Sequence, residues 1–238
     1  MKSARAYSIF VLVLVAASLV GLPVPRANAD QMTIRAIAMG QANGAANPAG
    51  AAWKRIPSAT LSLVTAPAVH PSISGTASAR HVSVQSIEAE GRVFFRLKWR
   101  DSTKNASRQD TFQFFDGVAI QFPLDGKTDT AILMGNPGNR VNIWYWRADG
   151  RVQNLFADGF GTLTLAPVQD VSGRGNYANG AWTVVFSRPS KAAASDEAQF
   201  DGIDQIPVAV AVWNGSNHER DGFKAVTLEW QSLVFGKR

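Results

Sequence analysis

Few residues of this sequence can do chemistry at a metal or a nucleophilic site, and their scarcity limits the sites it can build. The 238 residues include no cysteine and three histidines, His70, His81 and His218. Without thiolates the chain cannot form disulfides, zinc ribbons, iron–sulfur clusters or the thioether bonds of c-type haem. A metal would have to depend on carboxylates, on a rarer ligand such as methionine or lysine, or on a partner subunit.

Lys224 is the first residue in an unusual setting. Asp221-Gly222 opens an expected strand, in which the alternation of side chains places Lys224, Val226, Leu228 and Trp230 on one face. Lysines are rarely buried unless paired, so Lys224 lies either at the rim with its ammonium in water, or inward, where it is neutralised or bound. Coordination to iron would take the neutral amine, which burial favours.

Met134 is the second. It is the only methionine beyond residue 39, and it ends an expected strand, Thr130–Met134, that stops at Gly135-Asn136-Pro137. Most methionines at strand ends fill gaps in a core. The aromatic run Trp144-Tyr145-Trp146 follows and could wall a large flat apolar cofactor, although tryptophans also build the cores of β-sandwiches.

Established catalytic motifs are missing from the sequence. There is no G-x-S-x-G elbow, H-E-x-x-H helix, phosphate-binding loop or EF-hand. The pairs Asp125 with Asp129 and Asp201 with Asp204 could contribute to a calcium site, but two carboxylates in a turn are more often simply solvated. We therefore expect no independent hydrolase.

The elements that must position these residues are mostly strands. With 46% hydrophobic and 18% charged residues, the chain can bury one sizeable core. Segments rich in Val, Phe and Trp, separated by turns, predict a mainly β fold: a single antiparallel β-sandwich with few short helices. Strands are expected at 32–39, 60–64, 81–85, 93–99, 112–122, 130–134, 141–146, 182–187, 208–213 and 225–235, a hairpin turn at Asn179-Gly180, and one short helix at Ser190–Phe200.

The N-terminus predicts export. Lys2 and Arg5 precede an apolar run from Ile9 to Leu22, and Ala27-Asn28-Ala29 follows as a small-residue cleavage site. We expect a Sec-type signal peptide at 1–29, cleaved after Ala29, and one periplasmic domain at 30–238. The run is shorter than the about 20 residues of a membrane span. Cleavage would halve the formal charge of +6, because Lys2, Arg5 and Arg26 are removed, and no basic cluster predicts a nucleic-acid partner.

These features resemble a known family. The signal peptide, Met134-Gly135-Asn136-Pro137 followed by Val141–Arg147, and the C-terminal Val212-Trp213-Asn214-Gly215 with Arg220–Lys224 are similar to the haem b-binding gamma subunit of periplasmic molybdenum enzymes of the dimethyl sulfoxide reductase family. Members include ethylbenzene dehydrogenase, dimethyl sulfide dehydrogenase, selenate reductase and chlorate reductase. The resemblance implies that Met134 and Lys224 ligate one haem b per chain, in a β-sandwich similar to cytochrome domains of the DOMON type.

The same resemblance implies a role. Iron with both axial positions filled by protein exchanges single electrons without binding substrate, so the subunit would be non-catalytic. It would relay electrons between the iron–sulfur beta subunit of a complex whose alpha subunit carries molybdenum, and a soluble c-type cytochrome. A chlorate or selenate reductase type is favoured, and the direction of electron flow is not encoded in this chain.

A different class of function stays open on the residues alone. In a secreted carbohydrate- or ligand-binding β-sandwich, Trp144, Trp146 and Trp213 would form a stacking platform, and Met134 and Lys224 would be ordinary residues. His218, six residues before Lys224, is a further candidate haem ligand.

Overall fold

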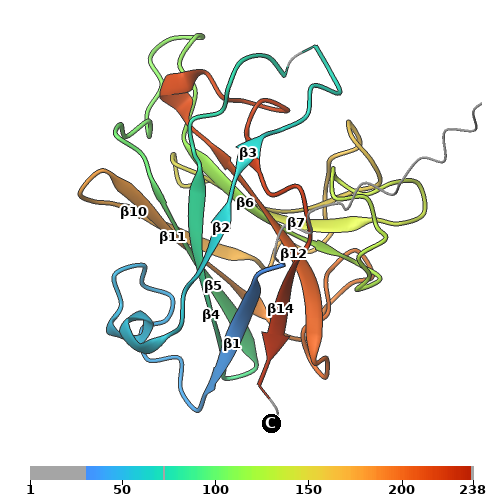
Figure 1. The fold of residues 1–238 in the computed structure, drawn as a ribbon. Helices are drawn as coiled ribbons and strands as arrows, with labels where there is room; N and C mark the ends of the chain where they lie inside the picture. The colour runs from blue at the N-terminus through green and yellow to red at the C-terminus, as the bar shows by residue number, and fades with distance from the viewer. Residues whose placement is uncertain (1–30, 72, 237–238) are drawn as a thin grey trace, which may run out of the picture.

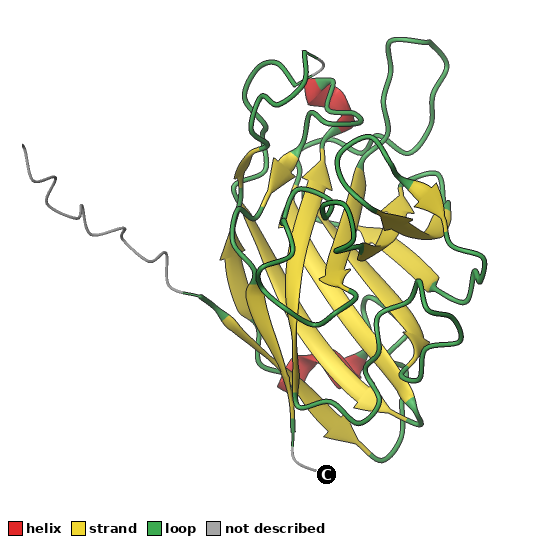
Figure 2. Cartoon of the chain, turned by 90° about the vertical axis from the view of Figure 1, so that its right-hand side faces the viewer, coloured by secondary structure: helices red, strands yellow, loops and turns green. Residues whose placement is uncertain are grey.

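The fold is known from a computed structural model that describes residues 31–71 and 73–236. The expected signal peptide lies outside the described residues. The strands are β1 (Thr33–Met39), β2 (Ala59–Ser62), β3 (Val64–Thr65), β4 (His81–Ala89), β5 (Arg92–Arg100), β6 (Gly117–Pro123), β7 (Val141–Arg147), β8 (Val152–Ala157), β9 (Thr164–Leu165), β10 (Ser172–Tyr177), β11 (Ala181–Pro189), β12 (Gln205–Trp213), β13 (Ala225–Val226) and β14 (Gln231–Phe235). Two short 3₁₀ helices, η1 (Ala51–Arg55) and η2 (Gly215–Asn217), lie at opposite ends of the molecule (Figure 2).

The strands form two layers that share β12 (Figure 1). One layer has the order β10-β11-β5-β4-β1-β14, and the other has the order β12-β6-β7-β8-β9. The first half of β12, Gln205–Val208, pairs with β14, and its second half, Ala209–Trp213, pairs with β6. The predicted β-sandwich is confirmed. Its pairing is antiparallel except at β1, which runs parallel to both of its neighbours, β14 and β4.

Side chains from both layers meet in the main core. Phe95 from the first layer packs against Phe122 and Trp144 from the second, with ring centroids 5.5 and 5.6 Å from its own. Because side chains alternate along a strand, the residues between these core positions point to the opposite face of the second layer. That face is also apolar, with Ala119, Ile143, Leu155 and Ala209 in a separate buried cluster. The second layer therefore has to be covered on both faces.

Most of the predicted strands are present, and the tight turn at Asn179-Gly180 joins β10 to β11. Both turn residues have a positive φ, 53° and 67°, as this hairpin type requires. The strand expected at 112–122 begins only at Gly117, and the one expected at 225–235 is interrupted between β13 and β14. The strand predicted at Thr130–Met134 is wrong, because this segment is a turn.

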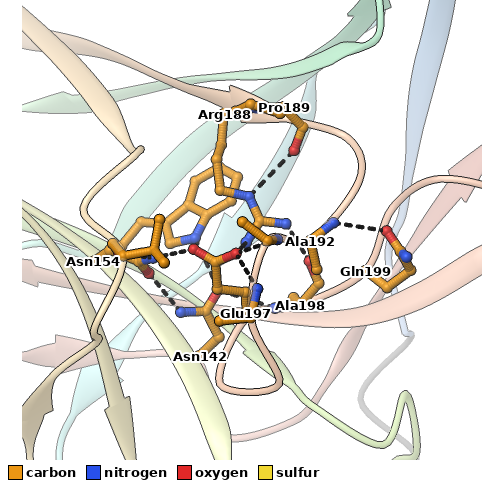
Figure 3. Close-up of polar contacts among 12 residues, drawn as sticks. Asn142, Asn154, Arg188, Pro189, Ala192, Glu197, Ala198 and Gln199 are labelled. Atoms are coloured by element: carbon orange, nitrogen blue, oxygen red, sulfur yellow. Dashed lines mark hydrogen bonds and ion pairs between the residues drawn. The ribbon is translucent and has the colours of Figure 1, made fainter.

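The helix predicted at Ser190–Phe200 is also wrong: the segment is a loop organised by a buried ion pair (Figure 3). The Glu197 carboxylate lies 3.6 Å from Nη1 of Arg188, and both side chains are fully buried. The same carboxylate accepts hydrogen bonds from the backbone N–H groups of Ala193 and Ala194 and from Asn154 Nδ2. A buried carboxylate must be satisfied in this way, and these bonds outweigh the helix propensity of the alanines.

Candidate functional site

A cavity of about 850 Å³ lies on the outer face of the second layer. This volume is in the range of cofactor pockets in proteins. The floor comes from β6, β7, β8 and β12, and the cover comes from loops that precede or follow these strands and from the loop between β3 and β4. Lining residues include Ala66, Pro67, Val69, His70, Ile73, Arg108, Phe114, Phe115, Ala119, Gln121, Ile132, Met134, Ile143, Tyr145, Arg147, Leu155, Phe160, Leu163, Ala209, Ala211, Trp213, Glu219, Arg220, Asp221, Lys224 and Val226.

The floor is made flat by small side chains. Ala119 of β6 pairs with Ala211 of β12, and Ala209 follows on the same face of β12. A methyl group rises little from the sheet, so a planar ligand can lie close to the strands. Tyr145 of β7, which pairs with Ala119, is half-buried, and burial raises the pKa of its hydroxyl to about 12. This surface suits a flat and largely apolar ligand.

Met134 reaches the cavity from a turn and not from a strand end. Its φ is 68°, in the left-handed region that costs a residue with a side chain about 1–2 kcal/mol. Its backbone carbonyl accepts a hydrogen bond from the N–H of Gly159 at 2.9 Å. Gly135, at φ 79°, is required beside it, because a Cβ there would lie 2.6 Å from the carbonyl oxygen of Asn139. The turn thus holds a half-buried Met134 against its intrinsic backbone preference.

Lys224 reaches the same cavity from the loop before β13. Its Nζ donates a hydrogen bond to the backbone carbonyl of Asp221 at 3.3 Å and lies 5.0 Å from the ring centroid of Trp213. The whole residue is half-buried, yet its amine is enclosed enough that burial lowers the pKa to about 8, against the opposing effect of the Asp221 charge. Of the two placements left open by the sequence, the structure favours the inward one.

The residues present are chemically suited to hold a haem, and Met134 and Lys224 are the two that would bind its iron. Met134 and Lys224, 90 positions apart in the chain, line one cavity with a flat apolar floor. A thioether and a desolvated amine are both able to donate to iron, and burial moves the amine toward the neutral form that donates.

Two histidines behave differently from expectation. His218 is exposed, packs edge-on against Phe114 with centroids 6.0 Å apart, and does not line the cavity. His70, which the sequence did not single out, does line it and lies 6.0 Å from the ring centroid of Phe160. Its loop has no periodic pattern from which this placement could be predicted.

Three arginines of the cavity were also missed: Arg108, Arg147 and Arg220. Arg147 is paired with Asp149 through bonds of 3.0 Å from Nε and 2.6 Å from Nη2. This pairing raises the pKa of Arg147 and lowers the pKa of Asp149. The three arginines come from separate segments, so no local spacing predicts that they meet.

The predicted platform of three tryptophans does not form. Trp144 and Trp146 are 0% and 3% exposed and lie in the core between the layers, whereas Trp213 lines the cavity on the other face. Trp144 and Trp146 do not line the cavity either. Two of the three tryptophans proposed to stack on sugars are therefore inaccessible to a ligand.

Other candidate sites hold nothing comparable. The Asp125 carboxylate accepts from Lys127 N–H at 3.0 Å and from Thr130 Oγ1 at 3.1 Å, so it organises a turn. Over residues 31–71 and 73–236, no cluster of three or more His, Asp or Glu side chains is arranged to hold a metal ion. In the same part of the chain, no helix has the length and apolarity needed to cross a membrane.

Comparison with known proteins agrees with the sequence resemblance. The family model described as Ethylbenzene dehydrogenase matches residues 50–164 and 161–225. The chain is 46% identical to the chlorate reductase subunit gamma of Ideonella dechloratans, over 80% of each chain. It is 36% identical to the dimethylsulfide dehydrogenase subunit gamma of Rhodovulum sulfidophilum, over 75% of this chain and 71% of that one.

Two further matches concern the cofactor and the fold. A Haloferax mediterranei protein named as a heme subunit of a respiratory nitrate reductase is 39% identical, over 79% of this chain and 68% of that one. A solved structure from Bacteroides uniformis, named as a carbohydrate-binding protein, superposes with a TM-score of 0.51 at 10% identity, over 86% of this chain and 99% of that one. At this identity the superposition supports the sandwich fold alone.

Proposed function

This chain belongs to the ethylbenzene dehydrogenase family, and from that membership we propose that it is a non-catalytic electron-transfer subunit carrying one haem b. The observation that carries the proposal is the convergence of Met134 and Lys224 on one cavity with a flat apolar floor. The relative named as a heme subunit supports the cofactor, and the relatives named as gamma subunits support a place in a larger complex.

The chain's own residues would position and tune the cofactor. Met134 offers a soft thioether, which favours ferrous iron. Lys224 offers an amine that loses its proton more readily because burial lowers its pKa. When bound, haem b would supply one-electron chemistry at its iron, with substrate kept away by two protein ligands. The alanine floor and the loops above it would exclude water from the ring faces.

We further propose the complex in which this subunit works. A molybdenum-containing alpha subunit would carry out the substrate chemistry, an iron–sulfur beta subunit would conduct electrons, and a soluble c-type cytochrome would exchange them with this chain. The identity of 46% to a chlorate reductase subunit gamma supports the chlorate or selenate reductase type. Export by the peptide at 1–29 would place the complex in the periplasm.

An absorption spectrum tests the proposal. The chain is co-expressed with its partner subunits and measured oxidised and dithionite-reduced, and its haem is counted by a pyridine haemochrome assay. We expect a low-spin b-type spectrum and one haem per chain. A colourless but fully assembled complex would refute the haem proposal and direct attention to ligand or glycan binding in the same cavity.

A further inference from the structure

Two of the cavity's arginines lie over neighbouring aromatic rings. The guanidinium of Arg220 is 4.6 Å from the ring centroid of Phe114, and that of Arg147 is 4.7 Å from the ring centroid of Phe115. The two phenylalanines are consecutive and both line the cavity, so Arg147 and Arg220 contact the same short segment of its lining. Arg108 lines the cavity from the same loop, six residues before Phe114.

These arginines differ in whether their charge is balanced. Arg147 is held by Asp149, as described above. Among the residues that the structure describes, neither Arg108 nor Arg220 has a carboxylate oxygen within 4.0 Å, and both are exposed. The cavity lining therefore includes two guanidinium groups that form no ion pair with an acidic side chain of the described residues.

The acidic residues nearby do not change this conclusion. Glu219 lines the cavity but is buried, and its carboxylate accepts from the backbone N–H groups of Ser78 at 2.7 Å and Asn214 at 3.0 Å. Asp221 is exposed and uses its backbone carbonyl to hold Lys224. Neither carboxylate pairs with Arg108 or Arg220.

The two segments that carry these arginines are fixed against each other. Asp116, at the end of the Arg108 loop, is fully buried and accepts a hydrogen bond from the N–H of Gly215 at 2.9 Å. Gly215 packs so closely on this loop that a Cβ would lie 1.9 Å from the carbonyl oxygen of Phe114. Arg220 follows five residues after Gly215, so the loop bases are positioned before any ligand binds.

We propose that Arg108 and Arg220 bind the two propionate carboxylates of haem and so set which edge of the ring faces this end of the cavity. The inference rests on the proposed function and deepens it. A guanidinium presents N–H groups in a plane that matches a carboxylate, and a ring face such as that of Phe114 holds it in orientation. Two unengaged guanidinium groups beside an apolar floor match a flat ligand with two carboxylates.

The test compares two porphyrins that differ only in these carboxylates. The full chain, stripped of haem, is titrated with ferric protoporphyrin IX and with its dimethyl ester, and binding is followed by the Soret band. The proteins are the wild type, R108L/R220L, R108K/R220K, and R174L as a control with an exposed arginine on β10.

We expect the wild type and R174L to bind the acid at least about tenfold more tightly than the ester, as charge-assisted hydrogen bonds imply. R108L/R220L should lose this preference while binding the ester as the wild type does, which also shows that the variant is folded. R108K/R220K should keep part of the preference.

Three results would overturn the proposal. The wild type could bind acid and ester equally, the double leucine variant could keep its preference, or it could lose acid and ester binding alike because the arginines are structural. If the wild type binds acid and ester equally and R108L/R220L also assembles less well with the partner subunits, the arginines serve a protein interface instead. A wild type that binds neither porphyrin would contradict the proposed function itself.

Discussion

Trp213 and Lys224 donate hydrogen bonds to the same acceptor, the backbone carbonyl of Asp221. The indole Nε1 is 3.2 Å from this oxygen and the lysine Nζ is 3.3 Å from it, while Nζ also lies 5.0 Å from the indole centroid. Asp221 itself has a φ of 50°. The indole and the turn together hold the amine at the cavity.

Weakening this arrangement should loosen the cofactor. We expect Trp213→Leu to reduce the affinity for ferric protoporphyrin IX about fivefold, because it removes the ring that packs against the Lys224 amine and the indole hydrogen bond, of about 1 kcal/mol, that holds the Asp221 turn. Trp213→Phe should have a smaller effect, since a ring remains over the amine. Soret titrations measure both, and equal affinity of all three proteins would show that Trp213 does not position Lys224.

Removing either proposed ligand should change the spin state. Met134→Ala and Lys224→Ala should each convert the low-spin spectrum of the complex to a high-spin or rearranged one. His218→Ala, which alters an exposed residue away from the cavity, should leave the spectrum unchanged. His70→Ala is the stricter control because His70 lines the cavity, and loss of the low-spin bands in that variant would assign an axial position to His70.

The backbone conformation at Met134 predicts that a glycine variant is more stable than an alanine variant, the reverse of the usual order. At φ 68° glycine is unstrained, whereas alanine is not. Without haem, Met134→Gly should therefore have a larger free energy of unfolding than Met134→Ala, by about 1 kcal/mol. Urea denaturation of the two apoproteins measures the difference, and the usual order, with alanine more stable, would show that the turn relaxes.

Filling the floor should block the cofactor without unfolding the protein. Ala211→Phe places a ring where the proposed flat ligand lies, so haem content should fall by about tenfold or more while the core between the layers stays intact. Thr60→Phe, at an exposed position of β2 in the other layer, is the matched control. Haem content follows from the pyridine haemochrome assay, and circular dichroism reports the fold; normal haem content in Ala211→Phe would place the ligand elsewhere.

Asp101 gives the fold a pH dependence. Burial and the neighbouring Asp116 charge raise the pKa of Asp101 from 3.8 to about 6. Between about pH 4 and pH 6 the folded state therefore holds a proton on Asp101 that the unfolded state has released. The stabilising contribution of the protonated carboxyl is fully present below about pH 4 and is lost as the pH rises through about 6. The Asp101→Asn variant lacks this titration. The difference in free energy of unfolding, variant minus wild type, should therefore be about 1 kcal/mol larger at pH 8 than at pH 4.5. Thermal unfolding at both values measures this, and a difference that does not vary with pH would contradict it.

Strands with regular apolar alternation were predictable from the sequence. A strand whose residues are small because a neighbouring side chain leaves no room was not predictable. β10 has the sequence Ser-Gly-Arg-Gly-Asn-Tyr, which has low strand propensity. Gly175 is required there because a Cβ would lie 2.1 Å from the indole of Trp146. The need for glycine comes from a residue 29 positions away, so no local pattern can indicate it.

The same limit applies to the cavity. Family resemblance proposed Met134 and Lys224 as ligands, and both line the cavity, but the local interpretation of Met134 as the end of a strand was wrong. No pattern assigned a role in the cavity to Arg108, Arg147, Arg220 or His70, because three loops and the end of β7 bring them together from four parts of the chain. What the sequence could predict is the alternation that leaves β6 and β12 apolar on both faces.

The sharing of β12 between the layers has a consequence for the motions of the protein. Val208 and Val210 of this strand belong to the core, while Ala209 and Ala211 line the cavity floor. Separating either layer requires breaking hydrogen bonds of β12, so its amide protons should be among the slowest to exchange with deuterium. A ligand on the floor should slow them further, and it should do so on the β14 side as well as on the β6 side.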